Sequence, residues 1–328
     1  MAQAYRAGPG PSRSKRPPSL RYSCWSVAAS TLPPMALPPA DELVRTISRD
    51  GSVLVRALVA TQLVREAAQR HGAFPTAAAA LGRALMGAVL IAAEGKDEET
   101  VQLQFRGDGP LRSITVIADA QGHVRGFAGD PTAHPPPREG KLDVAGALGR
   151  GVLAVVRYHP AWREPYTGVV PLVSGEIAKD LAHYLRESEQ KPSAVALGVY
   201  LGTTGEVEAA GGFLVQALPK ADDETLARLE RAVHSIGPPS QLIRTGLRAD
   251  DLIDRLLEGV GAGERHRTHP AFLCRCDRDR VRQAVVLLGR NELQEIARSG
   301  EELEVRCEFC ASRYRIPADE VGGLVPDA

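Results

Sequence analysis

The sequence predicts an α+β protein: a mixed, largely antiparallel sheet domain with helices, then a helical linker and a small cysteine-rich C-terminal domain. Three observations lead to this prediction. Predicted strands outnumber predicted helices up to residue 221, and several neighbouring strands are spaced as hairpins. Short, charged helices follow. Four of the five cysteines then lie in the last quarter of the 328-residue chain.

We therefore expect four segments along the chain. They are a leader (1–40), an α+β domain (41–221), a metastable helical linker (222–263) and a cysteine domain (264–328).

The composition excludes several classes of partner. Hydrophobic residues make up 44% of the chain and charged residues 24%, as in an ordinary soluble globular protein. The formal net charge is zero, so the chain has no strong attraction to nucleic acid. An aromatic content of 5% provides no stacking platform for single-stranded nucleic acid. No apolar run approaches the ~20 residues of a membrane span.

The leader, residues 1–40, is rich in proline, serine and alanine and lacks a core-forming period, so we expect it to be disordered. It carries five basic residues and no acidic one, which resembles an organelle transit peptide over residues 1–34. The favoured alternative is a misassigned translation start, with Met35 rather than Met1 as the first residue. Pro33 and Pro34 interrupt its apolar stretch and argue against a secretory signal.

Cysteine usage indicates the compartment. The chain is poor in cysteine outside the C-terminal domain, unlike a disulfide-stapled secreted scaffold. Cys24, in the leader, is expected to be incidental. We therefore expect a reducing compartment and a cytoplasmic location.

Apolar periodicity places the elements of the α+β domain. The expected strands cover residues 52–59, 101–105, 113–118, 123–127, 151–158, 193–201 and 211–217. The expected helices cover residues 61–71, 77–93 and 174–186. Ser174 is the candidate N-cap of the last helix. Residues 106–110 contain glycines without the order of a dinucleotide-binding loop, so they predict a hairpin turn.

The linker is more charged than the α+β domain and is predicted to be helical. Residues 222–236 predict a charged helix whose apolar residues form one stripe. Shorter helical pieces follow over residues 241–244 and 248–260, and glycines at 259, 261 and 263 predict a flexible joint. Helices of this kind depend on docking for their stability, so this segment is a candidate for switching between order and disorder.

The C-terminal domain is predicted to hold a helix over residues 278–288, a second helix capped by Asn291 and ending near Gly300, and a strand over residues 303–306. So small a domain has a thin core and usually needs a metal or a disulfide.

Two pairs of closely spaced cysteines, here called clips, are candidates to bind such a metal or to form such disulfides. Cys274 and Cys276 form a C-x-C clip, Cys307 and Cys310 form a C-x-x-C clip, and 30 residues separate them. Two such pairs brought together make a tetrahedral thiolate site for one Zn²⁺. The thiols of each pair are also close enough for a local disulfide.

Zinc would dominate the stability of this domain. Structural zinc contributes about 10–16 kcal/mol in small peptides, comparable with the roughly 5–15 kcal/mol that stabilises a whole domain. Its loss should unfold most of residues 266–328. The alternative is an inert zinc ribbon, but the unusual C-x-C clip favours a reactive site. Neighbouring arginines are candidates to offset the thiolate charge: Arg275, Arg278, Arg306 and Arg313. His266 and His269 are expected to be exposed linker histidines rather than ligands.

Several stretches resemble the redox-regulated 33 kDa heat-shock chaperone family, from about residue 41 to residue 321. They are FRGDGPL (105–111), PYTGVVPLVSGEIAKDLAHYL (165–185), SEQKPSAVALG (188–198), GGF (211–213), and residues 272–276 joined to EVRCEFCASRY (304–314).

The resemblance implies a holdase without enzymatic activity that works without ATP under oxidative stress. The reduced, zinc-bound form would be inactive. Oxidation would form the disulfides Cys274–Cys276 and Cys307–Cys310, release zinc, unfold the C-terminal domain and the linker, and activate binding of unfolding client proteins. The family's active forms are homodimers.

Two other functions remain open at this point. A zinc-ribbon module would dock on nucleic acid or a ribosome, against which the neutral charge argues. A thiol–disulfide oxidoreductase would use Cys307 and Cys310, but no thioredoxin-like βαβ pattern surrounds them.

Overall fold

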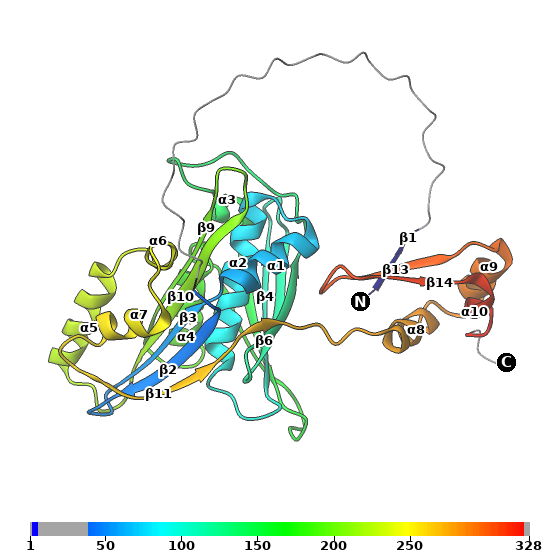
Figure 1. The fold of residues 1–328 in the computed structure, drawn as a ribbon. Helices are drawn as coiled ribbons and strands as arrows, with labels where there is room; N and C mark the ends of the chain where they lie inside the picture. Colours follow the sequence, from blue (N-terminus) through cyan, green and yellow to red (C-terminus); the bar gives the residue numbers. More distant parts are fainter. Residues whose placement is uncertain (1, 6–38, 325–328) are drawn as a thin grey trace, which may run out of the picture. The chain divides into compact units, whose positions relative to one another are not determined.

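The computed structural model describes residues 2–5 and 39–324 (Figure 1). These residues fall into two compact units. The larger holds residues 39–276 and 307–312, and the smaller holds residues 2–5, 277–306 and 313–324.

The larger unit contains two sheets. A five-stranded antiparallel sheet has the strand order β11-β2-β3-β10-β9. Its strands are β2 (Glu42–Ser48), β3 (Val53–Val59), β9 (Ser193–Leu201), β10 (Val207–Ala217) and β11 (Ala262–Thr268). The central strand β3 is rich in β-branched residues and is buried on both faces, so helices cover both sides of this sheet.

The second sheet has six strands in the order β12-β6-β5-β4-β7-β8. They are β4 (Thr100–Gly107), β5 (Ser113–Asp119), β6 (His123–Ala128), β7 (Gly151–Tyr158), β8 (Tyr166–Pro171) and β12 (Ala271–Phe272). Neighbouring strands are antiparallel except β12, which runs parallel to β6. The predicted largely antiparallel α+β fold is confirmed.

Four helices belong to the main core of the larger unit: α1 (Thr61–His71), α2 (Pro75–Ala92), α3 (Val144–Leu148) and α4 (Ala178–Glu187). The apolar α2 contacts strands of both sheets (Figure 1). Two glycines let neighbours approach closely: a Cβ on Gly82 would lie 2.5 Å from Val64, and one on Gly87 would lie 2.4 Å from Leu181. By length and composition α2 could cross a membrane, but 89% of it is buried in the fold, as in the core helix of a globular domain.

The linker helices cover the other face of the five-stranded sheet. They are α5 (Asp223–Ser235), α6 (Pro239–Arg244) and α7 (Ala249–Leu256). Apolar residues of β2, β3 and β10 form a second core with them. The helix α7 buries four of its residues, whereas α5 buries only Leu229. Much of α5 is therefore held by few apolar contacts.

The smaller unit has a three-stranded sheet in the order β1-β13-β14 and three short helices. Its elements are β1 (Ala2–Tyr5), α8 (Arg278–Val286), α9 (Arg290–Ser299), β13 (Leu303–Cys307), β14 (Arg313–Ile316) and α10 (Ala318–Gly322). Its core consists of seven buried apolar side chains, so it is thin, as the sequence predicts.

Four local predictions are wrong. Helix α4 begins four residues after Ser174, and its N-cap is Ile177. Helix α9 has Gly289, not Asn291, as its N-cap. The glycine-marked joint leads directly into β11, which contains Gly263 and pairs with β2. Residues 2–5 of the leader form β1, while Cys24 and Met35 lie outside the described residues.

Candidate metal centre

The first cysteine clip follows a short strand of the larger unit. β12 pairs with β6, and the backbone N–H of Leu273 donates to the carbonyl of Val124 at 2.9 Å. Phe272 is buried, and the guanidinium of Arg70 lies 5.3 Å from the centre of its ring. These contacts fix the chain immediately before Cys274.

The second clip lies in the turn between β13 and β14. The N–H of Cys307 donates to the carbonyl of Ser312 at 2.9 Å, and the N–H of Ala311 donates to the carbonyl of Cys307 at 2.8 Å. Ala311 has a φ of 59°, in the left-handed region. The turn therefore closes tightly and presents Cys307 and Cys310 together.

The structure brings together all four cysteines that the sequence predicts as ligands. Their Sγ atoms lie within 4.8 Å of one another. The Sγ atoms of Cys274 and Cys307 are 3.8 Å apart, and those of Cys276 and Cys310 are 3.3 Å apart. Sulfurs at the usual zinc–sulfur bond of about 2.3 Å form a tetrahedron with edges of about 3.8 Å. The four thiols therefore fit a zinc ion.

Burial and hydrogen bonding affect the thiols unequally. Burial raises the pKa of Cys274 and of Cys307. Burial would also raise the pKa of Cys310, but hydrogen bonds with Ser312, Cys276 and Cys307 together outweigh burial and lower that pKa to about 7. The hydroxyl of Ser312 lies 3.2 Å from the Sγ of Cys310. A divalent cation would favour the thiolate form of all four.

The accessory residues near the clips have contacts of their own. Both histidines near the first clip are exposed, as expected, and His269 contacts the carbonyl of Asp41 at 3.1 Å. Three of the four candidate arginines are neutralised by carboxylates rather than by thiolates. These ion pairs join Arg275 to Asp119 at 3.7 Å, Arg278 to Glu320 at 2.5 Å and Arg313 to Glu304 at 3.0 Å.

Phe309, which lies between the cysteines of the second clip, makes contacts that the sequence does not predict. Its ring meets Phe127 edge-on, with centroids 5.3 Å apart, and the guanidinium of Arg125 lies 5.4 Å from its centroid. Nε2 of His71 lies 3.2 Å from the carbonyl oxygen of Phe309. These contacts join the clip to α1 and β6. Only the aromatic character of Phe309 signalled them, because its partners lie far away in sequence.

The chain is similar to known proteins along most of its length. A family model described as Hsp33 protein matches residues 41–317. The 33 kDa chaperonin of Geobacter sulfurreducens is 44% identical over 284 residues, which cover 87% of this chain and 94% of that protein. The 33 kDa chaperonin of Symbiobacterium thermophilum is 45% identical, with 86% and 96% covered.

A solved structure has the same fold. The crystal structure of the 33 kDa chaperonin from Thermotoga maritima superposes with a TM-score of 0.83 at 33% identity, covering 88% of this chain and 98% of that one. The chain therefore belongs to the Hsp33 family, whose members are chaperones and not enzymes.

Proposed function

We propose that this chain is a redox-regulated holdase that binds unfolding proteins without ATP and is activated by oxidation. The observation that carries this proposal is the cluster of four free thiols, with every Sγ within 4.8 Å of the others. Such a cluster is both a zinc site and a store of oxidisable sulfur.

In the reduced form, Cys274, Cys276, Cys307 and Cys310 hold one Zn²⁺. Bound zinc would keep the four sulfurs as thiolates and fix the chain at both ends of residues 277–306, which belong to a unit with a thin core. The hydrogen bonds around Cys307 and the contacts of Phe309 orient the second clip toward the first.

In the oxidised form, Cys307 and Cys310 make one disulfide, and Cys274 and Cys276 make the other. Each disulfide removes two electrons from a pair of thiolates, and hydrogen peroxide accepts them together with two protons from water and becomes two waters. Sulfur–sulfur distances of 3.8 and 3.3 Å run between the clips, as in a metal site that both clips share. Once that site is lost, the partner nearest each thiol along the chain is the other cysteine of its own clip.

Oxidation would destabilise the linker. We propose that residues 41–221 bind clients and dimerise, that residues 222–263 form a metastable linker, and that residues 264–328 form the switch. The linker helices cover an apolar face of the five-stranded sheet. Their release would expose that face to unfolding clients in the cytoplasm.

The test is suppression of aggregation. Reduced, zinc-loaded protein and peroxide-treated protein are each added to citrate synthase as it unfolds at elevated temperature, and light scattering is recorded without ATP. We expect suppression by the oxidised form and little by the reduced form. Equal suppression by both forms, or none by either, contradicts the proposal.

A further inference from the structure

The outer edge of β9 carries unpaired backbone groups. β9 pairs with β10 on one side only. The N–H of Ala217 donates to the carbonyl of Pro192, and hydrogen-bonded pairs alternate along an antiparallel ladder. The N–H and C=O groups of Val195, Leu197 and Val199 therefore point away from β10. No other element in the described ranges, 2–5 and 39–324, hydrogen-bonds them.

This edge lacks most of the usual protection against strand pairing, because the register shift between β9 and β10 lies only at the end of β9, opposite Tyr200 and Leu201. Proteins guard exposed edges with charges, prolines, bulges or short strands. β9 has nine residues, SAVALGVYL, with neither a charge nor a proline among them. At the opposite edge of the same sheet, β11 carries Glu264, Arg265 and Arg267. In the other sheet, β8 has six residues and ends at Pro171.

A continuous groove follows this edge. One cavity of about 960 Å³ touches residues 195–205 in unbroken succession. Successive side chains of a strand point to opposite faces, so this cavity runs along the edge of β9 rather than over one face. A second cavity of about 710 Å³ continues it past Pro192, Ser193 and Ala194. Lys179 lines both cavities, which therefore adjoin.

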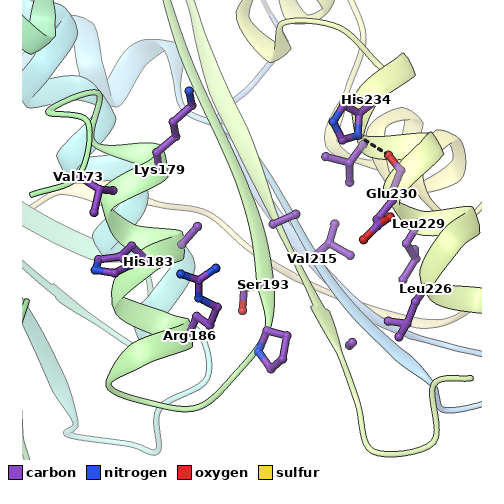
Figure 2. Close-up of a pocket in the computed structure, with 15 residues that line it drawn as sticks. Val173, Lys179, His183, Arg186, Ser193, Val215, Leu226, Leu229, Glu230 and His234 are labelled. Atoms are coloured by element: carbon purple, nitrogen blue, oxygen red, sulfur yellow. Dashed lines mark hydrogen bonds between the residues drawn. The ribbon is translucent and has the colours of Figure 1, made fainter. Parts of the chain in front are cut away.

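The two walls of the groove come from different parts of the chain. Figure 2 shows Lys179, His183 and Arg186 of α4 on one side and Leu226 and Leu229 of α5 on the other. Residues 238–241, at the start of α6, line the larger cavity. One wall thus belongs to the core and the other to the linker, so release of the linker would widen the groove.

The side chains that line the groove carry a net positive charge. Four basic and two acidic side chains line the two cavities, a formal excess of two positive charges. They are Arg83, Lys141, Lys179 and Arg186 against Glu176 and Glu230. A strand with acidic neighbours complements this lining.

We propose that the outer edge of β9 binds an extended, apolar segment of an unfolding client, flanked by acidic residues, as an additional antiparallel or parallel strand of the sheet. Backbone hydrogen bonds supply affinity without sequence specificity. The apolar wall of α5 favours apolar segments, and the basic lining favours acidic flanking residues. β9 is about 30 Å long at roughly 3.3 Å per residue, enough for a segment of a few residues to pair along it. This inference rests on the proposed holdase function and assigns that function a site.

The test uses the oxidised full-length chain and a synthetic peptide of alternating valine and threonine that begins with aspartates. Val195→Pro removes one outward N–H but no bond of the β9–β10 ladder. Val195→Ala shortens the same side chain and keeps the N–H, so it is the matched control. By fluorescence anisotropy we expect Val195→Pro to weaken peptide binding about tenfold relative to Val195→Ala. Equal binding by the two variants overturns the proposal.

A second measurement does not depend on how the variants fold. The same peptide with every amide N-methylated is more apolar but has no backbone donors. We expect wild-type protein to bind it much more weakly than the unmodified peptide, and to bind a lysine-flanked peptide more weakly than the aspartate-flanked one. N-methylated peptide that binds equally well overturns strand addition.

Two further outcomes distinguish client binding at β9 from dimerisation through β9 and from the holdase function as a whole. If Val195→Pro dissociates an oxidised dimer and the peptide does not compete with dimerisation, a second copy occupies the edge and the client assignment is wrong. If oxidised wild-type protein suppresses aggregation while every peptide result is negative, the holdase function stands and only the β9 site fails.

Discussion

A buried carboxylate, Asp180, organises the loop that leads into α4. It accepts hydrogen bonds from the N–H groups of Val173 and Ser174, each at 2.8 Å, and from that of Ile177 at 3.0 Å. Ile177 has a φ of 68°, which a β-branched residue seldom adopts, and it is fully buried. The SGEIAKD stretch therefore encodes a strained loop held by one carboxylate, which explains why Ser174 is not the helix cap.

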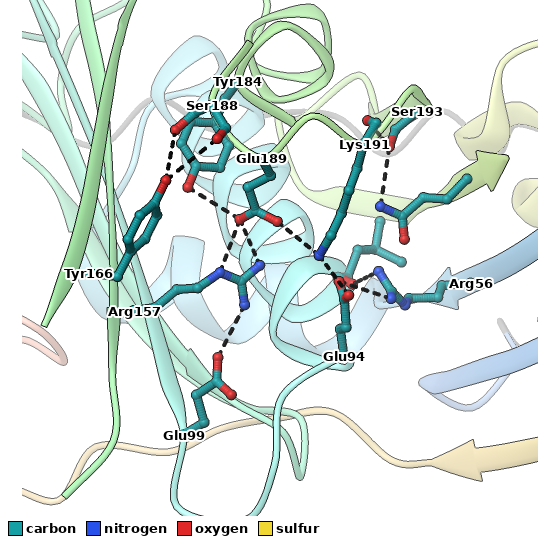
Figure 3. A network of polar contacts seen from close by, with 12 residues as sticks. Arg56, Glu94, Glu99, Arg157, Tyr166, Tyr184, Ser188, Glu189, Lys191 and Ser193 are labelled. Atoms are coloured by element: carbon teal, nitrogen blue, oxygen red, sulfur yellow. Dashed lines mark hydrogen bonds and ion pairs between the residues drawn. The ribbon is translucent and has the colours of Figure 1, made fainter. Parts of the chain in front are cut away.

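Two residues of the SEQKPSAVALG stretch belong to an ion-pair network (Figure 3). Glu189 contacts Arg157 at 2.8 Å and Lys191 at 3.1 Å, and Lys191 contacts Glu94 at 2.6 Å. Burial alone would lower the pKa of Arg157, but the carboxylate of Glu189 raises it. The network joins β7 to the end of α2 and the loop before β9, so its role is structural.

At the residue scale, Cys276→Ser tests the ligand set. A serine oxygen is a poor replacement for a thiolate, so we expect lower zinc affinity and a looser C-terminal domain even under reducing conditions. Competition with a chelator measures the affinity, and hydrogen exchange measures the loosening.

The matched control is Cys24→Ser, which removes the cysteine that lies outside both clips. It should leave zinc affinity unchanged. Full zinc affinity and an ordered C-terminal domain in Cys276→Ser would remove Cys276 from the ligand set.

Helices and strands with a clear apolar periodicity could be predicted from the sequence. The other elements have no such local pattern and are defined by their pairing in the folded protein. Helix α1 has the predicted bounds, and α2 and the β5–β6 hairpin differ from the prediction by a few residues. Strands β2, β8 and β11 were missed. β11, with the sequence AGERHRT, has no apolar alternation, because it is held by backbone pairing to β2 and by ion pairs. Such pairing joins residues more than 200 positions apart and leaves no local signal.

The linker is anchored at one buried carboxylate, Glu42 of β2. Arg248, before α7, and Arg267 of β11 contact it at 3.2 and 3.1 Å. The N–H of Ala249 also donates to it at 3.3 Å. One side chain of the sheet therefore holds both α7 and β11.

At the element scale, Glu42→Gln should loosen the linker. It keeps the shape of the side chain but removes its charge, which should cost about 1.5–3 kcal/mol, the contribution of a hydrogen bond to a charged group. We expect faster hydrogen exchange in α7 and β11 of the reduced protein and activation at a lower temperature.

Glu224→Gln is the matched control, because Glu224 is largely exposed and pairs with Arg228 within α5. An exposed pair of this kind contributes little, so this variant should behave as wild type. Unchanged exchange in Glu42→Gln would show that the carboxylate does not anchor the linker.

At the scale of the whole molecule, stability is unevenly distributed. The larger unit has two extensive apolar cores, while the smaller unit has seven buried apolar side chains. The four thiols lie in the larger unit, next to the points where the chain enters and leaves the smaller one, so loss of a metal would free the ends of residues 277–306 and leave the two extensive cores in place. The proposed switch would need both a stable sheet domain and a segment of low stability.

The clustering of the four cysteines could be predicted from the sequence, and the attachment of the cluster to the fold could not. Clip spacing is local, so a candidate set of four ligands follows from the positions of Cys274, Cys276, Cys307 and Cys310 alone. The contact of Phe309 with Phe127 depends on tertiary structure, so no local sequence pattern indicates it. The open edge of β9 likewise emerges only from the order of the strands.

The most direct test is zinc release, followed with a chromogenic chelator before and after peroxide at elevated temperature, with thiols counted in the same samples. We expect about one zinc per reduced chain, the stoichiometry of one four-thiolate site, released as the four thiols disappear. Mass mapping should place the disulfides within each clip. Zinc that stays bound with its thiols intact would contradict redox switching and indicate a purely structural metal site.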